Sequence, residues 1–259
     1  LILLTYKMYM KNMKLKVLGS ISPYVKENNN CPGYLIEKND NKVLLDCGSG
    51  ITREMNLHND LENLTIIISH LHRDHYADLL TLGYATFVYH RLGLLKEKVK
   101  VYIPNEESLD KKYLTNMEEH FLEFIPYEEN TKIQISDLEI TFKQNPHPVL
   151  TYSIKVKDNK YTLVYSSDTG YKNNSLEDFA KDADLFICET TFLKNQKGTI
   201  DNHLTTTEAA TIAKKASVKK LMITHTWPEI SQKLYLKETK ELFKKVIPAK
   251  TGKVLKIGR

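Results

Sequence analysis

The chain has 259 residues, of which 41% are apolar, and its 37 lysines and arginines exceed its 32 acidic residues for a formal net charge of +5. This composition provides a sizeable buried core and indicates an ordinary soluble globular protein, while the scattered charges permit an anionic substrate without arguing for one. Three cysteines without CxxC spacing, Cys31, Cys47 and Cys188, speak against a disulfide framework and favour a reducing, cytoplasmic compartment.

The first residues are expected to precede the fold. The apolar start LILL is too short for the core of a signal peptide, and no run in the chain approaches the length of a membrane span. Because MKLKVLGS, which starts at Met13, has the pattern of a first strand, residues 1–12 read as a possible N-terminal extension and residues 13–259 as a single domain. No contact with a membrane is expected.

From Met13 onward the chain predicts mainly strands. They are expected at 14–20 and 64–69, with a hairpin over 34–46 that turns at Asn39–Asn41. Apolar residues at helical spacing, without proline, predict a helix over 75–89.

Strands and helices continue to alternate through the rest of the chain. The expected elements are a strand at 100–104, a helix at 108–120, strands within 132–144, a hairpin over 151–168 that turns at Asp158–Asn159, a strand at 184–190, a helix at 206–216, a strand at 219–225, a helix at 237–246 and a strand at 253–258. Thr205 and Glu208 have the spacing of a capping box at the start of one helix. The predicted fold class is α/β, with two sheets face to face and helices outside, a four-layer αββα sandwich.

The stretch IIISHLHRDHYADLL places four metal-binding side chains, His70, His72, Asp74 and His75, directly behind an apolar strand. They are too close together for all four to bind one ion from a single regular element, but a turn at the strand end can direct two toward one ion and two toward a second. Imidazole suits zinc, and mixed histidine and aspartate ligation without thiolate fits a catalytic ion. The motif therefore predicts part of a dinuclear site.

Such a site needs further ligands, and the later part of the chain offers them. His147 follows the strand that ends near Lys143, Asp168 follows LVY, and His225 follows LMI. Each lies at the C-terminal end of an apolar strand, where polar side chains meet over the edge of a sheet. We expect all three to join the first motif.

With these pieces in place, residues from about Lys14 to Gly258 resemble the metallo-β-lactamase fold superfamily, in particular its ribonuclease Z-like phosphodiesterases. The matching segments are LLDCGSG, SHLHRDHYADLL, His147, SSDTG, ICETTF, HLTTTEAATIAKKA and LMITH. The resemblance implies that His70, His72 and His147 hold one zinc ion, that Asp74, His75 and His225 hold the other, and that Asp168 bridges them. It also implies His203 as proton donor and Glu189 as the carboxylate that orients it, so that the predicted catalytic residues are Asp74, His203 and Glu189.

The chemistry explains these residue types. Two zinc ions about 3.5–4 Å apart can share a hydroxide, lower its pKa toward neutrality and hold both oxygens of an in-line displacement at phosphorus. Protonation of the leaving alkoxide requires a separate acid, which an imidazole held by a carboxylate can supply. Asp46 is expected to accept the N–H of a ligand imidazole. Zinc is the expected metal, with manganese and iron as alternatives.

The chain departs from ribonuclease Z in ways that bear on the substrate. A single hairpin joins His147 to Asp168 where tRNA-processing members carry a long flexible arm, and TWPE follows His225 in place of Ser-Ser-Arg-Tyr. We therefore expect a small phosphodiester, such as a cyclic nucleotide, or a short RNA end. The alternatives are tRNA 3′ processing, hydrolysis of another ester, thioester or lactone, and a non-catalytic binding module. The resemblance also suggests a homodimer.

Overall fold

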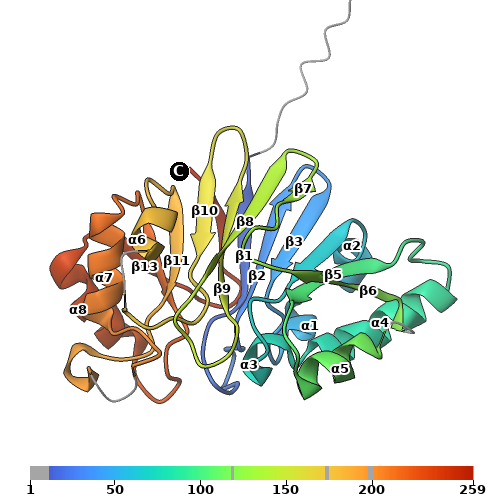
Figure 1. Cartoon of the computed structure of the whole chain (residues 1–259), viewed down its shortest axis with the longest axis horizontal. Coiled ribbons are helices and arrows are strands. Elements are labelled where there is room, and N and C mark those ends of the chain that lie inside the picture. Colours follow the sequence, from blue (N-terminus) through green and yellow to red (C-terminus); the bar gives the residue numbers. More distant parts are fainter. Residues whose placement is uncertain (1–11, 118–119, 173–174, 198–200, 259) are drawn as a thin grey trace, which may run out of the picture.

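The computed structural model describes residues 12–117, 120–172, 175–197 and 201–258, so the expected extension lies, apart from Asn12, outside the described residues. Two seven-stranded β-sheets face each other, and helices cover their outer faces (Figure 1). The predicted four-layer αββα sandwich is confirmed. None of the helices in the described part of the chain combines the length and the apolar character needed to span a bilayer.

The first sheet has the strand order β14-β1-β2-β3-β4-β5-β6. Its strands are β1 (Lys14–Gly19), β2 (Gly33–Lys38), β3 (Asn41–Leu45), β4 (Leu64–Ile67), β5 (Val99–Pro104), β6 (Leu122–Tyr127) and β14 (Val254–Lys256). Strands β3 to β6 pair in parallel. Their C-terminal ends therefore share one edge, where Asp46 follows β3 and the histidine motif follows β4.

The second sheet has the strand order β13-β12-β11-β10-β9-β8-β7. Its strands are β7 (Ile133–Ile135), β8 (Leu138–Gln144), β9 (Tyr152–Lys157), β10 (Thr162–Tyr165), β11 (Leu185–Glu189), β12 (Leu221–Thr224) and β13 (Val246–Pro248). Strands β10 to β13 also pair in parallel. Asp168, Glu189 and His225 thus lie at or just beyond neighbouring C-terminal strand ends.

The helices fall into two groups, one for each sheet (Figure 1). The first sheet is covered by α1 (Ile51–Glu54), α2 (Leu57–Asp60), α3 (Arg73–Tyr76), α4 (Leu79–Arg91) and α5 (Leu109–Thr115), and the second by α6 (Ser175–Phe179), α7 (Thr206–Lys215) and α8 (Gln232–Leu242), with a short 3₁₀ turn η2 (Lys194–Gln196). Each group buries its own apolar cluster against its sheet. The predicted capping box at α7 is present, because Thr205 accepts from the Glu208 amide and Glu208 accepts from the Thr205 amide.

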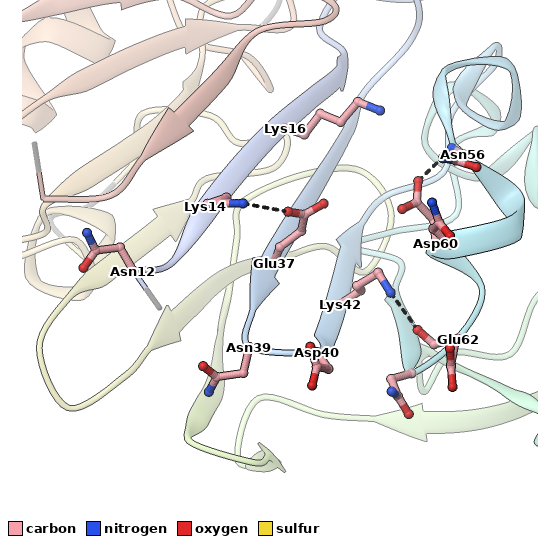
Figure 2. A pocket seen from close by; sticks show the side chains of 12 residues that line it. Asn12, Lys14, Lys16, Glu37, Asn39, Asp40, Lys42, Asn56, Asp60 and Glu62 are labelled. Atoms are coloured by element: carbon pink, nitrogen blue, oxygen red, sulfur yellow. Dashed lines mark hydrogen bonds and ion pairs between the residues drawn. The ribbon is translucent and has the colours of Figure 1, made fainter. Parts of the chain in front are cut away.

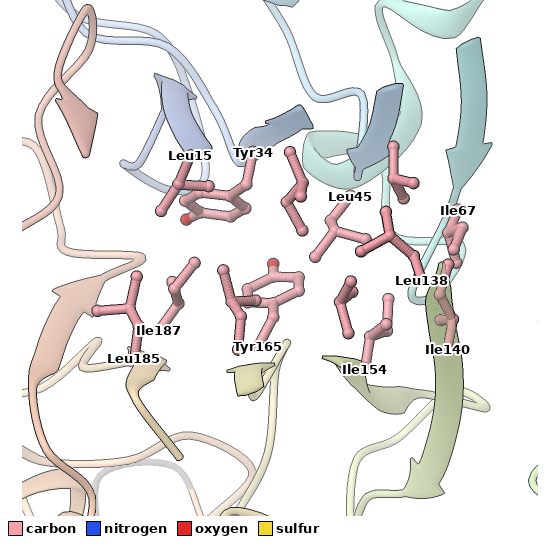
Figure 3. Packing of buried hydrophobic residues seen from close by; sticks show 14 of the residues in the cluster. Leu15, Tyr34, Leu45, Ile67, Leu138, Ile140, Ile154, Tyr165, Leu185 and Ile187 are labelled. Atoms are coloured by element: carbon pink, nitrogen blue, oxygen red, sulfur yellow. The ribbon is translucent and has the colours of Figure 1, made fainter. Parts of the chain in front are cut away.

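The core between the sheets is filled by side chains from both inner faces (Figure 3). Leu15 and Tyr34 from the first sheet meet Tyr165 and Ile187 from the second, and the two tyrosine ring centroids lie 4.9 Å apart. Each large apolar side chain buried here contributes roughly 1.5–3 kcal/mol to folding. This layer fixes the two sheets relative to each other, and with them the strand ends that carry the polar residues.

Two predicted helices differ in their bounds. The helix expected over 75–89 is broken between α3 and α4, because the amide of Asp78 donates to the carbonyl of Cys47 instead of continuing the helical ladder. The helix expected over 237–246 occupies 232–242, and Val246 belongs to a strand that pairs with Leu221. In both places a bond to a distant segment overrides the local pattern.

Other elements were shorter than expected or were missed. The helix expected over 108–120 is seen at Leu109–Thr115, capped by Ser108. Strand β6 was not predicted; it lies at a sheet edge, where Pro126 is tolerated because one side of the strand needs no ladder bonds. Helix α6 was also missed, since a single helical turn gives little periodicity to detect.

Candidate metal centre

The first predicted ligands lie in the loop after β4 and in α3: His70, His72, Asp74 and His75. The loop after β3 holds this segment in place, because the amide of Cys47 donates to the carbonyl of His75 at 2.8 Å. A Cβ atom on Gly48 would lie 2.0 Å from the carbonyl oxygen of Asp74. Only glycine permits this approach between the two loops.

The second sheet contributes the other predicted ligands, His147 between β8 and β9, Asp168 after β10 and His225 after β12. The structure brings all seven residues together. They form two groups, in each of which the possible ligand atoms lie within 4.8 Å of one another: His70, His72, His147 and Asp168 in one, and Asp74, His75 and His225 in the other. A third group with the same spacing, Asp168, His203 and His225, overlaps both.

Left-handed backbone conformations turn the chain into this site. Asp46, Ser167 and His225, which follow the ends of β3, β10 and β12, have φ angles of 59°, 51° and 56°. For a residue other than glycine, the left-handed backbone conformation is less stable than the right-handed one by roughly 1–2 kcal/mol. Strain of this kind persists only where the surrounding structure enforces it. Here it falls on one candidate ligand, His225, on Ser167 beside Asp168, and on Asp46, which holds His75.

Asp168 lies between the two groups. Its Oδ1 is 3.3 Å from Nε2 of His75 and 3.2 Å from Nε2 of His225, while its Oδ2 is 3.6 Å from Nε2 of His70 and 4.0 Å from Nε2 of His147. Nδ1 of His72 is 3.2 Å from Nε2 of His147. The carboxylate therefore presents one oxygen to each group.

These spacings fit metal ions. Ligand atoms placed tetrahedrally at about 2.0–2.1 Å from zinc lie about 3.3 Å from one another. Nε2 of His70 and Oδ1 of Asp168 are buried and make no hydrogen bond, although buried polar atoms are normally paired. A cation within reach of each would satisfy both atoms, and the histidine and aspartate donor set suits zinc.

The charge distribution at the site also attracts cations. Burial lowers the pKa of His70 well below its ordinary value and that of His147 to about 4, which leaves both imidazoles neutral and able to donate a lone pair. Burial lowers the pKa of His75 as well, but Asp168, Asp74 and Asp46 outweigh it and raise this pKa well above its ordinary value. Negative charge is thus concentrated around His75, and a proton or a metal ion balances it.

Asp46 is buried beneath the second group and accepts four hydrogen bonds. Its donors are Nδ1 of His75 at 2.7 Å, the amide of Ser69 at 2.7 Å, the hydroxyl of Ser69 at 2.9 Å and the hydroxyl of Tyr165 at 2.7 Å. The bond to Nδ1 leaves Nε2 of His75 facing Asp168. This is the contact with a ligand imidazole that the sequence predicted for Asp46.

His203 and Glu189 lie beside the same centre. Nδ1 of His203 is 2.9 Å from Oε1 of Glu189 and 4.0 Å from Oδ2 of Asp168. Glu189 is buried and also accepts from the amides of Thr169 at 2.9 Å and Leu204 at 3.2 Å. Burial lowers the pKa of His203, but Glu189 outweighs it and raises this pKa to about 9. In the metal-free protein the imidazole of His203 is therefore protonated at neutral pH.

Several residues around the site escaped the sequence reasoning. The hydroxyl of Ser22 donates to Oδ2 of Asp74 at 2.7 Å, and the carbonyl of Asn202 lies 3.1 Å from Nδ1 of His147. The hydroxyls of Ser69 and Thr191 lie 3.1 and 2.9 Å from Nδ1 of His70 and His225. Ser69, Thr191 and Asn202 lie next to or near His70, Glu189 and His203 in the sequence, but such polar residues are common everywhere, and Ser22 is far from every predicted ligand.

A separate cavity of about 720 Å³ lies at the opposite ends of β3 and β4 (Figure 2). Its lining mixes lysines, such as Lys14 and Lys42, with carboxylates, such as Glu37 and Glu62, and contains no histidine or cysteine. The amine of Lys42 donates to the carbonyl of Glu62, and Lys14 pairs with Glu37. Its chemistry and position separate it from the metal centre.

Comparisons with known proteins give a consistent result. Residues 41–226 match the β-lactamase superfamily domain. The probable metallo-hydrolase YhfI of Bacillus subtilis is 32% identical over 214 residues, which are 82% of this chain and 86% of that protein. The crystal structure of YhfI, a metallo-β-lactamase fold protein, matches with a TM-score of 0.88 at 30% identity, over 95% of this chain and 99% of that one.

Two further relatives carry more specific names. A ribonuclease Z of Clostridioides difficile is 28% identical over 262 residues, covering 80% of this chain and 86% of that protein. The structure of a diphosphatase from the PhnP family has a TM-score of 0.76 at 15% identity, over 95% of this chain and 97% of that one. At that identity the likeness shows a shared fold alone.

Proposed function

Because the chain belongs to the metallo-β-lactamase fold superfamily and is a metal-dependent hydrolase, we propose that it is a dinuclear phosphodiesterase that cleaves a small phosphodiester or an RNA end with water. One observation carries this proposal. The carboxylate of Asp168 presents Oδ1 to His75 and His225 and Oδ2 to His70 and His147, at 3.2–4.0 Å. A single bound ion would use one of these two carboxylate oxygens and would leave the histidines that face the other oxygen without a metal partner.

The proposed ligands follow from the two groups. His70, His72 and His147 would hold one ion, Asp74, His75 and His225 would hold the other, and the carboxylate of Asp168, which turns one oxygen toward each group, would contribute to both. Two zinc ions held here would acidify water and neutralise charge on the phosphoryl oxygens. The protein keeps the ligands fixed: Ser22 donates to Asp74, the carbonyl of Asn202 orients His147, and Asp46 orients His75.

His203 is the proposed proton donor. Its Nδ1–H is held by Glu189, so the proton on Nε2 is the one available for transfer to the leaving oxygen. The contact with Glu189 supports this role, because a carboxylate favours the protonated imidazole, and an acid must carry its proton when the bond to phosphorus breaks. Glu189 acts through His203 and stabilises its positive charge.

The connection between His147 and Asp168 bears on substrate size. It consists of the β9–β10 hairpin and its flanking turns, without a further domain or arm. Recognition of a folded tRNA by shape needs a broad basic contact surface, and a hairpin alone does not provide one. This supports a small phosphodiester or a short RNA end. The resemblance to ribonuclease Z keeps tRNA 3′ processing as the second candidate.

Location and assembly remain predictions. All three cysteines are buried and free, in keeping with the reducing cytoplasm expected from the sequence. A homodimer is expected from the resemblance alone.

The test is a substrate panel with the zinc-loaded protein. Bis-p-nitrophenyl phosphate, cyclic nucleotides, a short RNA with a 3′ trailer, a precursor tRNA and a set of lactones and thioesters are assayed side by side, with Asp168→Ala as the inactive control. Turnover of phosphodiesters that is lost in the control supports the proposal. Turnover confined to carboxylic esters or thioesters would overturn it, and efficient cleavage of precursor tRNA alone would select the second candidate.

A further inference from the structure

The geometry points to Thr191 as a positioning residue: its hydroxyl connects Glu189 to His225 and fixes the proton of that imidazole on Nδ1, which leaves Nε2 free to bind metal. Through this link one carboxylate orients both the proposed acid and a proposed ligand. The inference rests on the proposed function of the centre and adds a residue to it.

The distances place the hydroxyl of Thr191 between two partners. It lies 2.7 Å from Oε2 of Glu189 and 2.9 Å from Nδ1 of His225, with the carbonyl of His225 farther away at 3.3 Å. A threonine hydroxyl has one proton to donate and two lone pairs to accept with. A carboxylate only accepts, and a hydrogen bond to its charge is about twice as strong as one between neutral groups.

The assignment of the protons follows. The hydroxyl proton goes to Glu189, so the hydroxyl oxygen can only accept from the imidazole. Nδ1 of His225 must therefore carry a proton, and in the neutral imidazole Nε2 then carries the lone pair. Nε2 is the atom that faces the centre, 3.2 Å from Oδ1 of Asp168 and 3.5 Å from Oδ2 of Asp74. The opposite tautomer would point a proton at the position of the cation.

The same carboxylate acts directly on His203. Oε1 of Glu189 holds Nδ1 of His203 at 2.9 Å, while Oε2 receives the hydroxyl of Thr191. Both imidazoles thus have Nδ1 held toward Glu189. The rings of His203 and His225 are stacked with centroids 5.4 Å apart, so their orientations are also coupled by contact.

A parallel arrangement on the other sheet supports this interpretation. Asp46 holds Nδ1 of His75 directly, and it accepts from the hydroxyl of Ser69, which lies 3.1 Å from Nδ1 of His70. Each sheet therefore contributes one buried carboxylate that reaches one imidazole directly and a second imidazole through a hydroxyl group. Of these two hydroxyl links, the one through Thr191 joins a proposed ligand to the proposed acid.

The test compares three variants in the full-length protein. Thr191→Val removes the hydroxyl at nearly constant volume, Thr191→Ser keeps it, and Thr190→Val is the matched control. Thr190 is the buried neighbour whose hydroxyl donates to the carbonyl of Cys188 at 3.2 Å and makes no hydrogen bond to a histidine in the described part of the chain. Zinc affinity is measured by competition with a chelator, and the tautomer of His225 is read from ¹⁵N spectra of its ring nitrogens.

We expect Thr191→Val to weaken the binding of one of two zinc ions by 10- to 100-fold, the range for residues that orient a ligand. Thr191→Ser and Thr190→Val should bind zinc as the wild type does, and the wild-type spectrum should show the proton of His225 on Nδ1. Equal affinities in Thr191→Val and Thr190→Val, or a wild-type proton on Nε2, would overturn the inference and leave the proposed function intact. A wild type that takes up no zinc would instead overturn the proposed function.

Discussion

Replacing Asp46 with asparagine should weaken both the fold and the metal centre, because every partner of this buried carboxylate is a donor. Oδ1 accepts from the amide of Ser69, and Oδ2 accepts from the hydroxyl of Ser69, the hydroxyl of Tyr165 and Nδ1 of His75. Asparagine offers one acceptor oxygen and one NH₂ group. Its best orientation keeps the oxygen at the Oδ2 position and turns the NH₂ group toward the amide of Ser69.

The magnitude follows from these contacts. A buried amide left without an acceptor loses about 1–3 kcal/mol, and the loss of charge on the bond to His75 removes about 1 kcal/mol more. We therefore expect Asp46→Asn to lower the free energy of unfolding of the metal-free protein by about 2–4 kcal/mol. Since His75 also loses the partner that orients its ring, zinc affinity should fall 10- to 100-fold.

The assay is urea unfolding of the metal-free protein together with chelator competition for zinc. Asp184→Asn serves as control, because Asp184 is also buried and accepts from the amide of Thr162 and the amine of Lys219, but has no hydrogen bond or ion pair with a histidine among the described residues. Both variants should lose stability, and only Asp46→Asn should lose zinc affinity. Wild-type zinc affinity in Asp46→Asn, or an equal loss in both variants, would refute the reasoning.

Three further predictions concern other parts of the molecule. His203→Ala should keep its zinc and cleave phosphodiesters with alkoxide leaving groups about 100-fold or more slowly. Cleavage that releases nitrophenolate should slow much less, because nitrophenolate leaves without a proton. Metal analysis and turnover assays on the same samples check this, and loss of zinc would contradict it. Gly48→Ala should displace the carbonyl of Asp74, because the added Cβ would lie 2.0 Å from its oxygen. Elemental analysis should therefore find less bound zinc in this variant, and a wild-type zinc content would contradict the prediction. Lys38 and Asp158 form a buried ion pair. Burial raises the pKa of Asp158, but Lys38 outweighs it and holds that pKa below its ordinary value. The pair therefore contributes stability above about pH 4, and this contribution is lost as the pH falls. Lys38→Met should therefore destabilise by about 3 kcal/mol at pH 7 and by less below pH 4, where the variant's Asp158 takes up a proton; a loss independent of pH in thermal unfolding would contradict this.

The layers of the fold, and the meeting of the candidate ligands at one edge of the sheets, could be predicted from the sequence because both rest on strong local signals. Apolar strands that end in His147, Asp168 and His225 place these residues at one sheet edge whatever the details of the loops. His70, His72, Asp74 and His75 follow β4 within six residues, too close together for all four to bind one ion from a regular element, so the sequence indicated two ions.

The rest depended on contacts between distant segments. The break before α4 arises from the bond between Asp78 and Cys47, and the strand at Val246 arises from pairing with β12. Neither partner is near in sequence. Thr191 was missed for a related reason: a hydroxyl acquires its role only when the fold brings Glu189 and His225 to either side of it.

Anomalous diffraction at the zinc edge, from crystals grown with zinc, tests the central claim most directly. Two ions bound by this chain should give two peaks about 3.5–4 Å apart on either side of the Asp168 carboxylate, one beside His70, His72 and His147 and the other beside Asp74, His75 and His225. A single peak, or no peak at this cluster with Asp168 turned away, would contradict the account.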